Sequence, residues 1–280
     1  MFVRTSLARV SLALSALILI TTLACGGGGS ASTPTNPTGP SGPSGPSGGN
    51  ACGAVMGFGD PQTIVNGTDC VTQAASSSVL WLHLLDASGG TVGFCSSTVI
   101  DSQWVLTAAH CLDEDVRGVK VDLGSGPLVV ASEFHFSPLY SGTGSASLDV
   151  GVVKFPQSLG RTPTPLLLSR EAQAGEQAVI AGFGQSATGS IGTLRAGFVT
   201  VTDVTSSYVV VTVTASTASA VCSGDSGGPL LISAGGKWSV AGITSSATAY
   251  CVANTSYFAR VKNSDISNFI LSYVPNPARQ

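Results

Sequence analysis

The chain has 280 residues, of which only 10% are charged, and its formal net charge at pH 7 is −3. It has no basic cluster, so nucleic acid is not expected as a partner. Its 35 glycines, with many valines, threonines and serines, favour strands and tight turns over helices. Neither the spacing of ligands for a metal site nor a phosphate-binding loop occurs, so no metal and no other cofactor is expected.

The first 24 residues have the features of an export signal. Arg4 and Arg9 precede an apolar run over residues 10–20, and small residues follow up to Cys25. The run is short for a membrane span, which needs about 20 residues, so a retained anchor helix is the weaker alternative. We therefore predict that residues 1–24 form a signal peptide.

The segment 22–25, Thr-Leu-Ala-Cys, resembles the cleavage box of a bacterial lipoprotein, although leucine is usual where Thr22 stands. In such proteins the cysteine is lipidated and becomes the mature N-terminus, so Cys25 would attach the chain to a membrane of the cell envelope. Ordinary secretion is the alternative. Removing Cys25 from the seven cysteines leaves an even six, which fits disulfide pairing in an oxidising compartment.

Residues 25–50 are nearly all glycine, serine, proline and threonine, so they cannot bury a core. They include three Gly-Pro-Ser repeats, which are far too few for a collagen triple helix. We predict a flexible to semi-extended stalk.

From residue 64 onwards, short apolar segments alternate with turns. The predicted strands cover residues 79–85, 98–100, 104–107, 119–123, 128–131, 150–155, 178–181, 198–202, 208–214, 240–244 and 257–261. Many short strands separated by turns predict an all-β sandwich or barrel, or two small barrels. Only residues 265–271 have a helical pattern, with Ser264 or Asp265 as the N-cap.

Three histidines are candidates for a catalytic base. His83 lies inside an apolar strand and His135 lies at a strand end or in a loop, so both are expected to be core or surface residues. His110 follows Thr-Ala-Ala and precedes Cys111. The alanines leave room, and the cysteine can tie this turn to a neighbouring strand. His110 is therefore the candidate base.

The segment 222–229 reads Cys-Ser-Gly-Asp-Ser-Gly-Gly-Pro. Glycines on both sides of Ser226 let the backbone approach a ligand closely. A serine on such a turn presents its hydroxyl outward while nearby N–H groups converge, which suits a nucleophile beside an oxyanion site. Taken alone, a Gly-x-Ser-x-Gly run is more often a plain turn between strands.

Together, residues 107–111 and 224–229 resemble two motifs of the trypsin/chymotrypsin-like serine proteases, and the resemblance runs from residue 64 to about residue 271. It implies two six-stranded antiparallel barrels, packed together with the active site between them, and a short C-terminal helix. Asp149 begins the apolar strand Asp-Val-Gly-Val-Val-Lys-Phe as the family's aspartate does, with Gly151 in place of the usual alanine.

The resemblance assigns Ser226 as the nucleophile, His110 as the general base and acid, and Asp149 as the residue that orients the imidazole. The N–H groups of Gly224 and Ser226 would form the oxyanion hole. Ser245 would hydrogen-bond to Asp149. These roles imply a serine endopeptidase that acts on protein or peptide substrates through an acyl-enzyme. The alternative is a catalytically inactive family member that serves as a surface binding or adhesion module. Such proteins usually lose a triad residue, and here all three are present.

The floor of the family's substrate pocket maps to Ala220, so the aspartate with which trypsins bind lysine or arginine is absent. The pocket walls map to Ala247 and Ser256. Ser245, Ser246 and Ala247 would pair with the substrate backbone as an added strand. We therefore expect a preference for apolar over basic side chains before the scissile bond.

Ile64 begins Ile-Val-Asn-Gly, which resembles the family's mature start. There, cleavage frees an α-amino group that pairs with the acid before the nucleophile, here Asp225, and completes the oxyanion hole. Thr63 stands where arginine or lysine is usual, so the activating protease is unknown and a trypsin-like one is not expected. Residues 51–63 would then be a pro-segment and residues 64–280 the protease domain.

Six cysteines permit many pairings from the sequence alone. The resemblance pairs Cys95 with Cys111 and Cys222 with Cys251, which leaves Cys52 for Cys70 across the predicted activation site. We expect an exported monomer, located in the bacterial cell envelope if it is lipidated and outside the cell otherwise.

Overall fold

The computed structural model describes residues 51–55, 68–70, 76–113, 115–142, 148–215, 218–249 and 251–280. All of them belong to one compact unit, Ser44–Gln280. The predicted signal peptide and stalk, the lipidation residue Cys25 and the activation residue Ile64 lie outside the described residues. None of the helices in the described part of the chain is long and apolar enough to cross a membrane.

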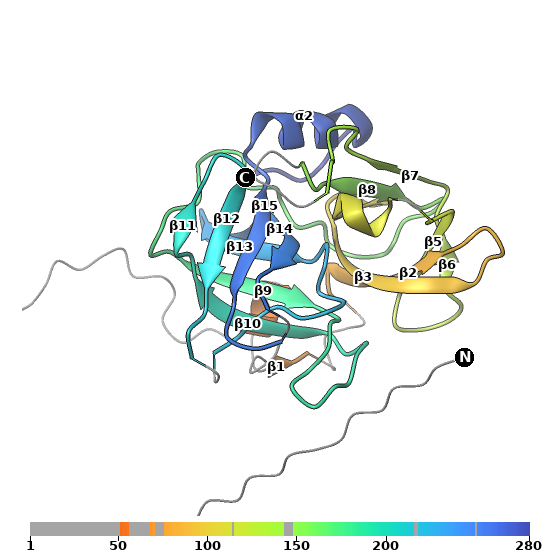
Figure 1. Ribbon diagram of the computed structural model, residues 1–280. Coiled ribbons are helices and arrows are strands. Elements are labelled where there is room, and N and C mark those ends of the chain that lie inside the picture. The colour runs from red at the N-terminus through yellow and green to blue at the C-terminus, as the bar shows by residue number, and fades with distance from the viewer. Residues whose placement is uncertain are drawn as a thin grey trace, which may run out of the picture. The chain divides into compact units, whose positions relative to one another are not determined.

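The strands form two antiparallel sheets, which Figure 1 shows in orange to yellow-green and, apart from the orange β1, in green to blue. The first has the order β6-β5-β2-β3-β4-β8-β7 and consists of β2 (Val79–Leu85), β3 (Thr91–Val99), β4 (Trp104–Thr107), β5 (Gly118–Asp122), β6 (Val129–Val130), β7 (Glu133–Phe136) and β8 (Gly151–Lys154).

The second sheet has the order β1-β10-β9-β13-β14-β15-β12-β11. Its strands are β1 (Thr68–Asp69), β9 (Gln177–Gly182), β10 (Arg195–Thr200), β11 (Asp203–Val204), β12 (Tyr208–Thr212), β13 (Pro229–Ala234), β14 (Lys237–Ala247) and β15 (Thr255–Arg260).

Each sheet closes on itself through one bent strand. In the first sheet β6 pairs with β5, and β7, which follows directly, pairs with β8, so residues 129–136 join the two open edges. In the second sheet residues 195–204 do the same, since β10 pairs with β9 and β11 with β12. Counting each bent strand once, both sheets are six-stranded barrels, with β1 added beside β10. The predicted fold is confirmed.

Alternation of apolar and polar residues explains the inner and outer faces of the barrels. In β5, Val119 and Val121 are buried while the residues on either side of them are partly exposed. One apolar cluster includes Leu82 and Val152 of the first barrel, and a second cluster fills the other barrel.

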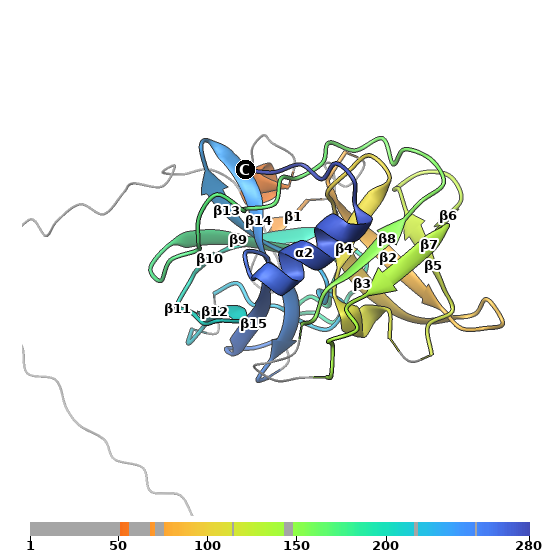
Figure 2. The same cartoon turned by 90° about the horizontal axis from the view of Figure 1, so that it is seen from above.

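Helix α2 (Ser264–Tyr273) lies across the junction of the two barrels (Figure 2). The predicted N-cap, Ser264 or Asp265, is wrong. The cap is Asn263, whose side-chain oxygen accepts hydrogen bonds from the N–H groups of Asp265 and Ile266. This satisfies two of the free donors at the helix start, and Ile266 behind them is fully buried.

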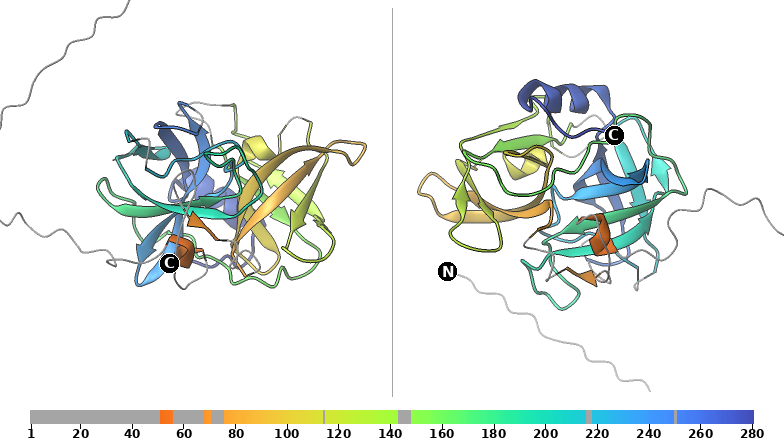
Figure 3. Two further views of the ribbon diagram at one scale, coloured as in Figure 1. Left: turned by 90° about the horizontal axis from the view of Figure 1, so that it is seen from below. Right: turned by 180° about the vertical axis from the view of Figure 1, so that it is seen from behind.

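Short helix α1 (Ala51–Ala54) is buried next to β1 and β10 (Figure 3). A disulfide joins Cys52 of α1 to Cys70, the residue after β1. A chain that is cut between these cysteines therefore remains covalently linked.

The sequence pattern missed β7, β13, most of β3 and the two-residue strands β1 and β11. β13 begins at Pro229, directly after two glycines, and both residue types weaken a strand pattern. β7 has no fully buried residue, so its apolar signal is weak. β3 starts on the surface and becomes buried only from Cys95.

Candidate active site

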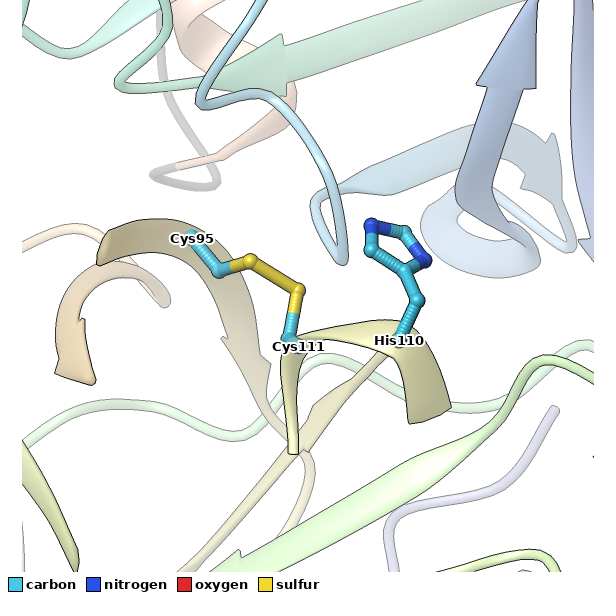
Figure 4. A group of neighbouring side chains, drawn as sticks. All are labelled: Cys95, His110 and Cys111. Atoms are coloured by element: carbon cyan, nitrogen blue, oxygen red, sulfur yellow. A yellow bond between two sulfur atoms is a disulfide. The ribbon is translucent and has the colours of Figure 1, made fainter. Parts of the chain in front are cut away.

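His110 lies on the 3₁₀ turn Ala109–Cys111, directly after β4. The backbone there packs tightly because Ala109 is fully buried and carries no bulky side chain. The disulfide between Cys95 and Cys111 attaches this turn to β3. In Figure 4 the imidazole of His110 projects from the same turn beside the disulfide.

Asp149 precedes β8 and is only 3% exposed, and its carboxylate accepts three hydrogen bonds. The backbone N–H of His110 donates to Oδ1 over 3.0 Å, and the imidazole Nδ1 lies 2.8 Å from Oδ2. The hydroxyl of Ser245 donates to the same Oδ2 over 2.6 Å. Because an ionised carboxylate can only accept, this geometry places the imidazole proton on Nδ1 and leaves Nε2 as an acceptor.

Ser226 lies on a turn that requires glycine on both sides. Gly224 and Gly227 have φ angles of 95° and 79°, which L-residues rarely adopt. A Cβ atom on Gly227 would lie 2.1 Å from Thr107 Oγ1 and 2.5 Å from the carbonyl oxygen of Ser96. The turn therefore packs directly against the first barrel.

Ser96 of β3 holds this turn to the first barrel through two hydrogen bonds. Its N–H donates to the carbonyl oxygen of Ser226 over 2.8 Å, and its hydroxyl donates to that of Gly224 over 2.8 Å. Sequence reasoning missed Ser96, because its partners are far away along the chain and no motif marks it.

One cleft of about 500 Å³ brings the candidate residues together. His110, Asp149, Gly224, Ser226 and Ser245 all line it. The other lining residues are Tyr140, Val221, Cys222, Ser223, Thr244, Ser246, Ala247 and Ala249.

Of the residues that sequence analysis assigned to the substrate pocket, Ser246 and Ala247 line the cleft together with Ser245. Ala220 and Ser256 are each only 2% exposed and lie outside the set of lining residues. Sequence analysis missed Tyr140 and Ala249, which lie in loops with no recognisable motif.

Asp225 is buried beneath the turn, 3% exposed. Its carboxylate accepts hydrogen bonds from the N–H groups of Cys222 and Gly184, each over 2.8 Å. Burial raises the pKa of Asp225 to about 6, against the lowering effects of these two N–H groups and of the Arg195 charge. Its predicted partner, Ile64, is outside the described residues, so the activation pair stays a prediction.

Cys222, at the start of the turn, forms a disulfide with Cys251. Two of the disulfides, Cys95–Cys111 and Cys222–Cys251, have the pairing that the family resemblance implies, and Cys52–Cys70 is the pair that was left over. The sulfurs of Cys95 and Cys111 and the imidazole of His110 lie within 4.8 Å of one another. The two sulfurs are bonded to each other, however, and a metal requires free thiolates.

Neither of the other histidines lines the cleft. His83 packs against Trp81 and Phe94, and desolvation lowers its pKa. His135 stacks on Tyr273 at a centroid distance of 4.1 Å, and its Nε2 lies 3.5 Å from Glu133.

A sequence profile of the trypsin family matches residues 64–270. Similar curated proteins include a trypsin, Tyr p 3.0101, of Tyrophagus putrescentiae, 31% identical over 110 residues (36% of this chain and 36% of that protein). Anionic trypsin of Bos taurus is 30% identical over 152 residues, 50% of this chain and 58% of that protein. Vitamin K-dependent protein C of Rattus norvegicus is 27% identical over 216 residues, 65% of this chain and 45% of that protein.

A solved structure of HL collagenase has the same fold, with a TM-score of 0.62 and 24% identity, and the match covers 75% of this chain and 97% of that one. The chain thus spans between 36% and 58% of the length of these three curated relatives. The family profile, in contrast, matches most of the chain. The chain belongs to the trypsin family.

Proposed function

We propose that this protein is a serine endopeptidase that hydrolyses peptide bonds through an acyl-enzyme. One observation carries the proposal: a buried carboxylate orients the imidazole of His110 through Nδ1, and His110 shares a cleft with Ser226. Membership of the trypsin family supports the same chemistry.

In the proposed mechanism Ser226 Oγ attacks the substrate carbonyl carbon while His110 Nε2 takes the hydroxyl proton. His110 then donates this proton to the leaving amine, which leaves an acyl group on Ser226. A water molecule, deprotonated by His110, attacks the ester and releases the acid product. Asp149 stays ionised throughout and stabilises the imidazolium.

We propose that the N–H groups of Gly224 and Ser226 bind the oxyanion of the tetrahedral intermediate. Losing one donor of this kind typically costs about 3 kcal/mol of transition-state stabilisation. The turn is well suited to this role because the carbonyl oxygens of Ser223 and Asp225, which share peptide planes with these two N–H groups, are themselves held. They accept hydrogen bonds from the N–H groups of Gln185 and Gly228 over 2.8 and 2.9 Å.

We propose that the enzyme prefers apolar side chains before the scissile bond. Among the described residues that line the cleft, Asp149 is the one acid, and its oxygens already accept three hydrogen bonds. Val221, Ala247 and Ala249 add apolar lining. A peptide library should therefore show cleavage after aromatic or medium-sized aliphatic residues. A strong preference for arginine or lysine would contradict the proposal.

We further propose that cleavage of the Thr63–Ile64 bond by another protease activates the enzyme, with Ile64 pairing with Asp225. The Cys52–Cys70 disulfide would keep the pro-segment attached. Three disulfides fit an exported protein. We propose a monomer with residues 1–24 removed, Cys25 lipidated and residues 25–50 forming a stalk.

Labelling with a fluorophosphonate probe, which reacts with activated serines, tests the function. The processed protein should be labelled and should cleave apolar peptides, while Ser226→Ala should do neither. An unlabelled processed protein would instead favour the alternative, an inactive family member that acts as a surface binding or adhesion module. Labelling that persists in Ser226→Ala would show that another serine reacts.

A further inference from the structure

Arg195, on β10, is a buried arginine outside the cleft, only 6% exposed. Its guanidinium group donates to Asp69 of β1 and to two residues of the loop between β9 and β10. Nε donates to Asp69 Oδ1 over 2.8 Å, Nη1 to the carbonyl oxygen of Gly184 over 3.1 Å, and Nη2 to Ser190 Oγ over 3.2 Å. A buried cation is costly unless it is paired and hydrogen-bonded, so this arrangement needs all three partners in place.

The first partner, Asp69, belongs to β1, the strand that follows the predicted activation site. Asp69 lies directly opposite Arg195 in the β1–β10 pairing. The Asp69 side chain is 54% exposed, whereas that of Arg195 is 7% exposed. The ion pair therefore fixes β1 from the buried side.

The second partner, Gly184, touches the turn that carries Ser226. Its carbonyl oxygen accepts from Arg195, and its N–H donates to Asp225 Oδ1 over 2.8 Å. A Cβ on Gly184 would lie 2.5 Å from Asp225 Cγ, and a Cβ on Gly224 would lie 3.0 Å from the Gly184 Cα. Gly184 therefore packs directly against the turn.

The third partner, Ser190, lies further along the same β9–β10 loop, which reaches this turn a second time. The next residue, Ile191, would be 3.1 Å from a Cβ placed on Gly224. Arg195 thus bonds to this loop at Gly184 and beside Ile191, the two places where the loop packs against Gly224, and its charge also lowers the pKa of Asp225.

We propose that Arg195 is a positioning residue for catalysis: it transmits the placement of β1, through Gly184, to the turn that forms the oxyanion hole. This inference rests on the proposed function. Arg195 does not line the cleft, so its loss weakens transition-state stabilisation and leaves substrate binding unchanged.

The test compares wild type with Arg195→Met, Arg195→Lys and Asp69→Asn in the processed enzyme. Arg195→Met should lower kcat about 10- to 100-fold with KM within about twofold, because the turn is displaced while the rest of the cleft is intact. Arg195→Lys keeps the positive charge but cannot make all three hydrogen bonds, so its kcat should lie between those of wild type and Arg195→Met. Asp69→Asn should show a smaller loss of kcat. Arg260→Met removes a comparable ion pair, to Glu171, and should leave kcat unchanged.

Two inhibitors separate positioning from a purely structural role. A peptide aldehyde forms a hemiacetal with Ser226 that needs the oxyanion hole, and the matching peptide alcohol does not. Arg195→Met should weaken binding of the aldehyde by the same factor by which it lowers kcat/KM, and it should leave binding of the alcohol unchanged. Equal weakening of both inhibitors, or unchanged kinetics, would overturn the inference.

If Arg195→Met does not fold, the same test applies to Arg195→Lys and Asp69→Asn: each should lower the affinity for the aldehyde relative to the affinity for the alcohol. A wild-type protein without activity would refute the proposed function. An active wild type with unaffected variants would refute the role of Arg195 alone.

Discussion

Replacing Asp149 with asparagine tests how the active site sets the imidazole tautomer. The carboxylate now accepts the backbone N–H of His110 at Oδ1, and the imidazole Nδ1 and the Ser245 hydroxyl at Oδ2. An amide NH₂ at the Oδ1 position would face the backbone N–H of His110, which cannot accept. The NH₂ must therefore take the Oδ2 position, where Ser245 can turn to accept.

With NH₂ in that position, Nδ1 of His110 becomes an acceptor and the imidazole proton moves to Nε2. A protonated Nε2 cannot take the proton of Ser226, so the enzyme must first restore the other tautomer. Restoring that tautomer breaks the hydrogen bond from the asparagine NH₂ to Nδ1. It also leaves the Nδ1 proton facing that NH₂, so that two donors oppose each other. In triads of this type the corresponding change costs about 10⁴ in kcat, equivalent to about 5 kcal/mol.

The assay is steady-state hydrolysis of an apolar fluorogenic peptide by the processed enzyme, with melting temperatures to confirm folding. Ser245→Ala is the matched control, since it removes one donor to Asp149 and keeps both bonds to His110. It should cost about tenfold in kcat. If Asp149→Asn kept kcat within tenfold of wild type, the reasoning on the tautomer would be refuted.

Three further predictions concern stability and processing. In the uncut chain the pKa of Asp225 is raised from 3.8 to about 6, so its neutral carboxyl adds about 3 kcal/mol of stability below pH 3.8 that is lost as the pH rises through about 6. Urea unfolding of Asp225→Asn should lack this loss, and parallel curves for the two proteins would contradict it. Gly227→Ala should destabilise by about 3 kcal/mol or more because its Cβ would lie 2.1 Å from a threonine oxygen, whereas Gly142→Ala, also at positive φ but with open space, should cost about 1 kcal/mol. Equal melting temperatures for the two variants would disprove this. N-terminal sequencing of the active enzyme should find a terminus at Ile64, and the pro-segment should be released only after the disulfides are reduced. An intact Thr63–Ile64 bond in active enzyme would contradict the activation proposal.

The two barrels could be predicted because two short motifs identify the family and many short apolar segments agree with it. Strands β7 and β13 could not be predicted, since the partial exposure of β7 and Pro229 at the start of β13 hide their patterns. Most of the residues that line the cleft near Ser226 lie in or beside the recognised motifs, so sequence reasoning reached them.

The supporting contacts could not be predicted, because they join residues that are distant along the chain. Ser96 bonds to Gly224 across 128 positions, and Arg195 pairs with Asp69 across 126. Such pairs depend on strand register, which a single sequence does not reveal. The burial of Ala220 and Ser256 is likewise a result of packing.

Locating the covalent adduct tests the central claim most directly. The processed enzyme is treated with a fluorophosphonate and digested, and the modified peptide is identified by mass spectrometry. We predict one adduct, on Ser226, whose formation is strongly slowed in His110→Ala. An adduct on a different serine, or equal rates in both proteins, would contradict the proposed roles of Ser226 and His110.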